Sequence, residues 1–181
     1  SELEEMRRRI ERLAEEVRTT VEEVVRRSEE LNKEVEKAVR KVVDENRRVL
    51  EEVKEEVRKE KDSRELIERL IRRIEETTKK LEDLVRKLVK ELRDSVEEIR
   101  KLIEDLIRRL KKVVREAKET VSKGKKEEVK RVEERVERVV EELRRLVEEV
   151  RKRNEDSIEK LKDLVRRSKE ESERVVKELE D

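Results

Sequence analysis

The side chains that could do chemistry in this 181-residue chain are hydroxyls and carboxamides that recur every 18 residues within an apolar pattern. The six positions are Ser28 and Asn46, Thr77 and Ser95, and Asn154 and Ser172. Four peripheral residues of the same kind lie close by in sequence: Asn32, Ser157, Thr78 and Ser168. Such groups donate and accept hydrogen bonds, so they could form a polar network or, beside a base, a nucleophile.

Catalysis and metal binding lack the other residues that they need. The chain has no His and no Cys, and neither Lys nor an acidic residue falls in an apolar register that could face a core. A hydroxyl nucleophile needs a base within reach, and a di-iron bundle site needs inward-facing Glu with His. We therefore predict no enzyme, no catalytic residue, no metal site and no cofactor.

The elements that carry these polar residues follow from the same 18-residue repeat. One apolar register reads Leu3, Val21, Val39 and Val57, and the same spacing continues to the end of the chain. Eighteen residues make five turns of an α-helix, whereas 7-residue and 11-residue repeats impose supercoils. The repeat predicts an all-α fold of straight, untwisted helices.

Two breaks divide the pattern into three helices. We expect helices over about 2–60, 63–121 and 126–180, with turns at 61–63 and 122–126, and a single domain over 1–181. Asp62 with Glu65 and Ser1 with Glu4 fit capping boxes, and Gly124 fits a left-handed helix stop. Because short turns make neighbouring helices antiparallel, the predicted architecture is a long antiparallel three-helix bundle.

Folding the chain at these turns brings the polar residues together. In an antiparallel pair, the numbers of two facing residues have a constant sum. For the first and second helices this sum is 123, and for the second and third helices it is 249. The first layer then holds Ser28, Ser95 and Asn154, and the second holds Asn46, Thr77 and Ser172. A buried polar group without a partner costs roughly 1–3 kcal/mol, so a shifted helix would be penalised. We interpret the layers as buried hydrogen-bond networks that fix register.

Two other interpretations of the layers stay open. The polar residues could face solvent at the edge of the apolar stripe, or they could line a cavity for water or a polar ligand. The agreement of the layers across all three helices favours the network.

These features together resemble de novo designed, parametrically generated helical bundles with built-in hydrogen-bond networks. The resemblance covers the whole chain, including its strict repeat, minimal turns and layered Ser, Thr and Asn. It implies a coiled-coil-like scaffold without natural biochemical function. Spectrin-type repeats also have three helices, but theirs are shorter and carry aromatic core residues, which this chain lacks.

The remaining expectations concern partners and stability. A net charge of +1 and the absence of aromatic residues disfavour nucleic acid and membrane surfaces, and nothing indicates a small-molecule substrate. No partner is required, but a homo-oligomer or helix-binding module is the alternative, through a seam broadened by Val25, Val43 and Leu50. No targeting pattern is recognised, so the chain is expected to be soluble, and cytoplasmic on recombinant expression. We expect hyperstability, with helical circular dichroism retained to about 90 °C.

Overall fold

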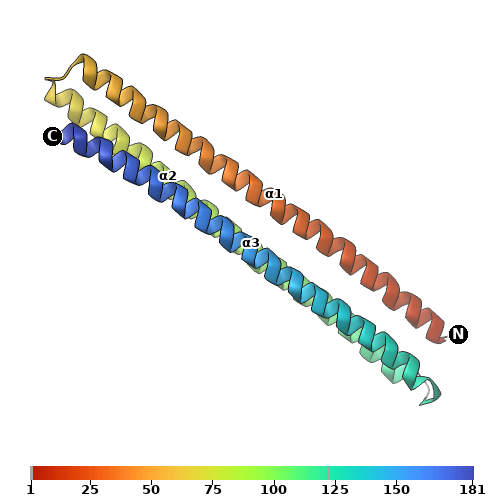
Figure 1. The fold of residues 1–181 in the computed structure, drawn as a ribbon. Helices are drawn as coiled ribbons and strands as arrows, with labels where there is room; N and C mark the ends of the chain where they lie inside the picture. Colours follow the sequence, from red (N-terminus) through yellow and green to blue (C-terminus); the bar gives the residue numbers. More distant parts are fainter. Residues whose placement is uncertain (1, 122) are drawn as a thin grey trace. The chain divides into compact units, whose positions relative to one another are not determined.

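Three long helices make up almost all of the chain. The computed structural model describes residues 2–121 and 123–181, without the side chain of Lys123. The elements are α1 (Glu2–Lys59), α2 (Arg64–Thr120), the short 3-10 helix η1 (Lys123–Lys125) and α3 (Lys126–Glu180) (Figure 1). The three predicted helices are confirmed, and their bounds differ from the predicted ones by one residue at most.

The charges at the helix ends favour the observed start and stop points. α1 opens on Glu2, Glu4 and Glu5 and closes on Arg58 and Lys59. Acidic residues stabilise the positive end of the helix dipole, and basic residues stabilise its negative end. Along the exposed faces, pairs such as Glu23–Arg27 and Glu36–Arg40 join successive turns. Each such pair adds roughly 0.2–0.5 kcal/mol of helix stability.

The cap of α2 differs from the predicted one. The backbone N–H of Leu66 donates to the Ser63 hydroxyl at 3.3 Å, and α2 begins at Arg64. Ser63 is therefore the N-cap, and the predicted box of Asp62 with Glu65 is wrong. A cap residue bonds the N–H two or three residues after it, so a helix that starts at Arg64 needs its oxygen at position 63.

The role predicted for Gly124 is also wrong. Gly124 lies within η1 and does not have a positive φ, so it is not a left-handed stop. A 3-10 turn commonly precedes an α-helix, and here η1, which contains Gly124, directly precedes α3. Ser1 of the predicted Ser1–Glu4 box and Ser122 of the second turn lie outside the described residues.

The contacts of the chain divide it into two compact units. The first unit is Ser1–Glu30 with Asp94–Arg153, and the second unit is Leu31–Arg93 with Asn154–Asp181. Each unit contains one segment of each helix. The single domain over 1–181 stays a prediction, as does the straightness of the helices.

Within each unit the α2 segment runs against the other two. In the second unit Asn46 lies beside Thr77, and Glu52 lies beside Arg73, so numbers rise on α1 as they fall on α2. In the first unit Arg135 contacts Glu11, and a second α1–α3 contact follows eighteen residues later on both helices. α1 and α3 are therefore parallel to each other there.

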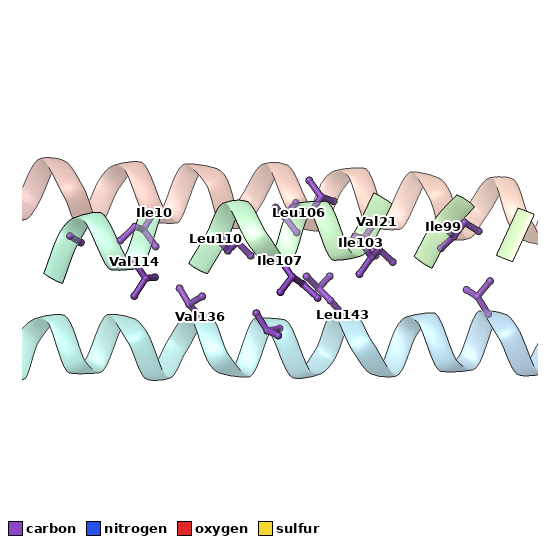
Figure 2. Packing of buried hydrophobic residues seen from close by; sticks show 14 residues of the cluster. Ile10, Val21, Ile99, Ile103, Leu106, Ile107, Leu110, Val114, Val136 and Leu143 are labelled. Carbon is purple, nitrogen blue, oxygen red and sulfur yellow. The ribbon is translucent and has the colours of Figure 1, made fainter. Parts of the chain in front are cut away.

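The buried hydrophobic cluster of the first unit consists of aliphatic side chains. Ile10 of α1, Val114 of α2 and Val136 of α3 point toward one another between the three helices (Figure 2). Buried Ile103, Ile107 and Leu110 continue this core along α2. The repeat thus brings one apolar face of each helix inward, as the sequence predicts.

The core of the second unit consists of two apolar clusters. One gathers around Val39, Leu81 and Leu161, and the other around Val53, Leu70 and Ile74. Along each helix the sequence between the two clusters holds polar residues of the predicted second layer. The apolar packing is therefore interrupted where Asn46, Thr77 and Ser172 occur.

Candidate functional site

All ten polar residues singled out in the sequence lie away from bulk solvent. Five are buried, namely Ser28, Asn46, Asn154, Ser168 and Ser172. The other five are half-buried, namely Asn32, Thr77, Thr78, Ser95 and Ser157. The burial of the first five does not fit the interpretation in which they face solvent at the edge of the apolar stripe.

Asn154 is the most enclosed of these side chains, with 1% of its surface exposed. Its Oδ1 accepts a hydrogen bond from Asn32 Nδ2 at 2.6 Å, and its Nδ2 donates to the backbone carbonyl of Leu92 at 3.2 Å. All three residues belong to the second unit. One carboxamide of α3 is thus bonded to α1 and to α2.

The layer predicted to hold Asn154 with Ser28 and Ser95 stays a prediction. Ser28 is buried and Ser95 is half-buried in the first unit. Asn32, predicted as peripheral, makes the direct side-chain bond. Ser157 is half-buried one turn farther along α3.

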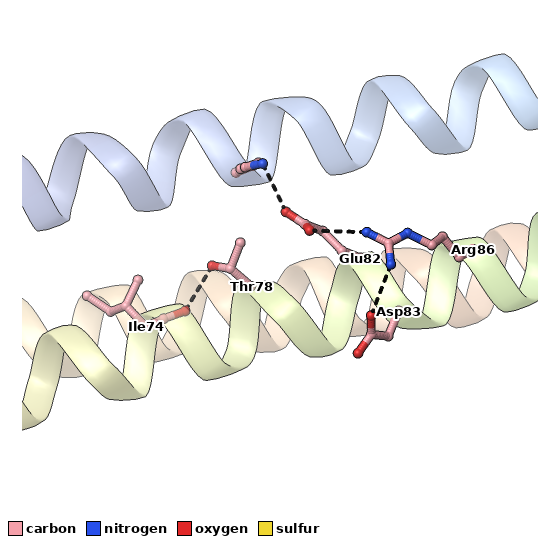
Figure 3. Close-up of polar contacts among 6 residues, drawn as sticks. Ile74, Thr78, Glu82, Asp83 and Arg86 are labelled. Carbon is pink, nitrogen blue, oxygen red and sulfur yellow. Dashed lines mark hydrogen bonds and ion pairs between the residues drawn. The ribbon is translucent and has the colours of Figure 1, made fainter.

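Of the second predicted layer, the structure places Asn46 beside Thr77. Asn46 Nδ2 approaches the backbone carbonyl of Thr77 at 3.5 Å, a long contact for a hydrogen bond. The hydroxyl of Thr77 donates to the Ile74 carbonyl of its own helix at 3.0 Å. The hydroxyl of Thr78 donates to the same carbonyl at 2.8 Å (Figure 3). The residue numbers 46 and 77 sum to 123, as the sequence predicts for this pair.

A cavity adjoins this layer in the second unit. It has a volume of about 330 Å³ and is lined by Thr78 and Ser172 together with charged residues that include Glu82 and Lys169. Glu82 and Lys169 form an ion pair at 3.2 Å that joins α2 to α3 (Figure 3). A water molecule needs two to four polar partners, and the hydroxyl groups and charged groups here could supply them.

A second cavity, of about 480 Å³, lies in the first unit. Its lining combines aliphatic side chains, among them the small Ala14 and Ala117, with charged side chains such as Glu11 and Arg135. In the 18-residue register of Ala117 the chain elsewhere carries Leu81 and Ile99. The cavity therefore occurs where the repeat uses a smaller residue.

The electrostatics of the molecule are those of surface ion pairs. The pKa of Glu97 lies below its ordinary value because the carboxylate accepts a hydrogen bond from Arg100. Arg151 lowers the pKa of Glu148 in the same way. Both carboxylates lie on the surface, so these shifts indicate local pairing of neighbouring side chains.

Two of the hydroxyls donate to groups that could not activate them for catalysis. Thr77 and Thr78 donate their protons to a backbone carbonyl, which is not a base. In the part of the chain that the structure describes, no cluster of three or more Asp, Glu, His or Cys residues could hold a metal ion. Among the same residues, no helix combines the length and apolarity needed to cross a bilayer.

With this geometry in place, comparison with solved structures is decisive for the fold. The structure superposes on a computationally designed three-helix bundle with a TM-score of 0.59 and 20% sequence identity, over 98% of this chain and 88% of the other. The fold is that of a three-helix bundle. No model of a protein family matches the sequence, and no curated protein is detectably similar to it.

Sequence reasoning missed the acceptors of the site. The carbonyls of Leu92 and Ile74 accept hydrogen bonds from Asn154, Thr77 and Thr78. Every residue carries a backbone carbonyl, so residue types hold no signal for which one accepts. The inward position of Asn32 could have been predicted from the sequence, because helical spacing places Asn32 on the same helix face as the apolar residues Val25 and Val43.

Proposed function

We propose that this chain is a designed structural scaffold whose buried Ser, Thr and Asn layers specify the register of its helices. The observation that supports the proposal is the bonding of Asn154, a buried carboxamide of α3 that is joined to Asn32 on α1 and to the Leu92 carbonyl on α2. A helix slid along its neighbours would leave these groups buried and unpaired.

Two variants at Asn154 distinguish a role in fixing the helix register from a role in stabilising the folded chain. Asn154→Ala removes bonds to both neighbouring helices, and we expect the free energy of unfolding in urea to fall by roughly 1–3 kcal/mol. Asn154→Leu combined with Asn32→Leu replaces both bonded carboxamides by apolar groups of similar size, and we expect this double variant to be neutral or stabilising, because the desolvation cost of both amides disappears as well. Equal and negligible effects of both variants would contradict the proposal.

The 18-residue repeat supplies a matched control. Val136 occupies the same register as Asn154 but packs in the aliphatic core of the first unit. Val136→Asn places the same carboxamide where the neighbouring side chains are apolar, so we expect a larger loss of stability than from Asn154→Ala. A harmless Val136→Asn would show that these helices accept buried amides anywhere.

The alternative is an interaction module that self-associates or binds another helix. Val25, Val43 and Leu50, the residues suspected of forming an open seam, are half-buried or buried against the core. Among the described residues the exposed large hydrophobic side chain is Leu102, at 36%. Light scattering after size exclusion separates the two functions: a molar mass near 22.1 kDa supports the closed scaffold, and a multiple supports assembly.

A further inference from the structure

Ion pairs between α1 and α3 recur with the repeat of the core. Glu11 pairs with Arg135 at 3.4 Å, Glu29 pairs with Arg153, and Arg47 pairs with Glu171 at 3.7 Å. The partners are 124 residues apart in the first two pairs, and the numbers 47 and 171 have the same separation. Successive pairs are 18 residues apart on both helices. We call these six residues the charge ladder.

The order of the charges makes the charge ladder selective. α1 carries negative, negative and positive charges, and α3 carries the complementary positive, positive and negative charges. A shift of α3 by one repeat in one direction would place Arg47 opposite Arg153. A shift in the other direction would place Glu29 opposite Glu171. The observed register is therefore the one in which every position of the ladder is attractive.

The seam between α1 and α2 is not complementary in this way. Glu52 pairs with Arg73 at 2.7 Å. One repeat away in the second unit, the equivalent positions hold Glu34 and Glu91, which have the same sign. The register of this seam is already restricted by the short turn before α2.

The seam between α2 and α3 also contains a like-charged position. Lys118 pairs with Glu133, and Glu82 pairs with Lys169. Midway between these two pairs, the equivalent positions hold Arg100 and Arg151. Each of these arginines bonds a carboxylate three residues earlier in its own helix. This seam too is restricted by a short turn.

The complete ladder thus lies on the one seam that no turn joins. We propose that it is a charge code by which α1 accepts α3 in one register and one direction. The face of α1 fits a parallel helix with two positive charges and then a negative charge at 18-residue spacing. It rejects the α1 helix of a second copy, because parallel alignment would oppose Glu to Glu and Arg to Arg. This inference rests on the proposed scaffold function and adds a surface determinant to the buried one.

Single pairs of this kind are weak, so the test must use the pattern. The ladder side chains are 46–68% exposed, and exposed ion pairs contribute little individually and are screened by salt. One variant of the full chain reverses α1 alone with Glu11→Arg, Glu29→Arg and Arg47→Glu. A second reverses α3 alone with Arg135→Glu, Arg153→Glu and Glu171→Arg. A third variant carries all six substitutions.

The control reverses the same number of charges elsewhere on α1. Glu30→Arg, Asp44→Arg and Arg48→Glu produce the same net charge change at exposed positions outside the ladder. Stability is measured by urea unfolding at low ionic strength and repeated at about 1 M NaCl, where the screening length is about 3 Å. Urea is chosen because guanidinium would itself screen the charges.

We expect stability to fall when the charges of one helix are reversed and to recover when the charges of both helices are reversed. Each three-residue ladder variant lowers the folding equilibrium constant by at least about tenfold at low salt, and the six-residue variant returns to within about threefold of the parent. The control loses less than about threefold, and the ladder losses shrink at high salt. A six-residue variant as unstable as the single-helix variants, or a control that loses as much, would overturn the proposal.

These outcomes are independent of the buried layers. The ladder variants leave Asn32, Asn46 and Asn154 in place, and the Asn154 substitutions leave all six ladder residues in place. If the charge-reversal variants fail to give the expected result while the Asn154 variants give theirs, only the inference about the charge ladder is contradicted. Failure of the Asn154 series would remove the proposed role of the buried layers.

Discussion

The side chain of Asn154 and those of Thr77 and Thr78 in α2 find their hydrogen-bond partners in different places. Asn154 forms hydrogen bonds with two neighbouring helices. The hydroxyls of Thr77 and Thr78 instead donate to the Ile74 carbonyl of their own helix. A hydroxyl that bonds within its own helix places no condition on the neighbouring helix. The carboxamide of Asn154 bonds to groups of two other helices, so it is the side chain that can carry register information here.

At the same scale, Ala117 should be replaceable by a larger residue. Ala117→Leu restores the side-chain size found at Leu81 in the same register, and Ala117 lines the cavity of the first unit beside the aliphatic Val114 and Val136. We expect the free energy of unfolding to rise by about 0.5–2 kcal/mol, as is usual for cavity filling. Ala38→Leu, outside that cavity, is the control and should gain less. A destabilised Ala117→Leu variant would show that the cavity cannot accept the side chain.

The residue scale also shows where sequence reasoning succeeds and where it ends. Burial of Ser28, Asn46 and Asn154 followed from their register in the repeat, because a helix of fixed pitch returns each eighteenth residue to the same face. Their hydrogen-bond partners did not follow. A shift of a few residues between helices exchanges one acceptor for another, and the pairing of Asn32 with Asn154 depends on such a shift.

At the scale of the elements, the helix bodies were predictable and the turns were not. The apolar repeat extends over dozens of residues, so it locates each helix well. A cap depends on one oxygen, and Lys61-Asp62-Ser63 offers two adjacent candidates, of which Ser63 is used. Gly124 could begin or end a helix, and the sequence alone does not distinguish the two roles.

The cap of α2 gives a direct prediction. Ser63→Ala removes the oxygen that accepts the Leu66 N–H, and we expect the free energy of unfolding to fall by about 0.5–2 kcal/mol. Asp62→Ala, one residue earlier, should cost distinctly less. Chemical denaturation of the two variants compares them directly, and a larger loss from Asp62→Ala would restore the capping box of Asp62 and Glu65.

At the scale of the whole molecule, the many charged side chains are of types that ordinarily titrate outside the neutral pH range. The chain has no His, so none of its side chains has an ordinary pKa between about 5 and 8. The lowered pKa values of Glu97 and Glu148 mean that their ion pairs contribute stability above the ordinary value of 4.5. That contribution is lost as the pH falls through the lower pKa of the folded state. The raised pKa of Arg100 matters only in strong alkali.

We therefore expect the free energy of unfolding in urea to be flat from about pH 6 to 8 and to decline below about pH 4.5. The measurement is a series of urea titrations across this range at constant ionic strength. The chain's balance of 54 basic and 53 acidic residues adds a second reason for the acid decline, since protonation leaves a large positive charge. A transition between pH 6 and 8 would conflict with this account.

The central claim, that buried polar layers give the helices one arrangement, can be tested with two single-site probes. The chain has one Met and one Gly, so selective labelling gives one methyl signal from Met6 and one amide signal from Gly124 for each conformation. The decisive variant carries Ser28→Val, Asn32→Leu, Asn46→Leu, Asn154→Leu and Ser172→Val. We predict one sharp signal per probe in the parent, and several or broadened signals in this variant despite equal or greater stability. One sharp signal from each probe in both proteins would contradict the claim.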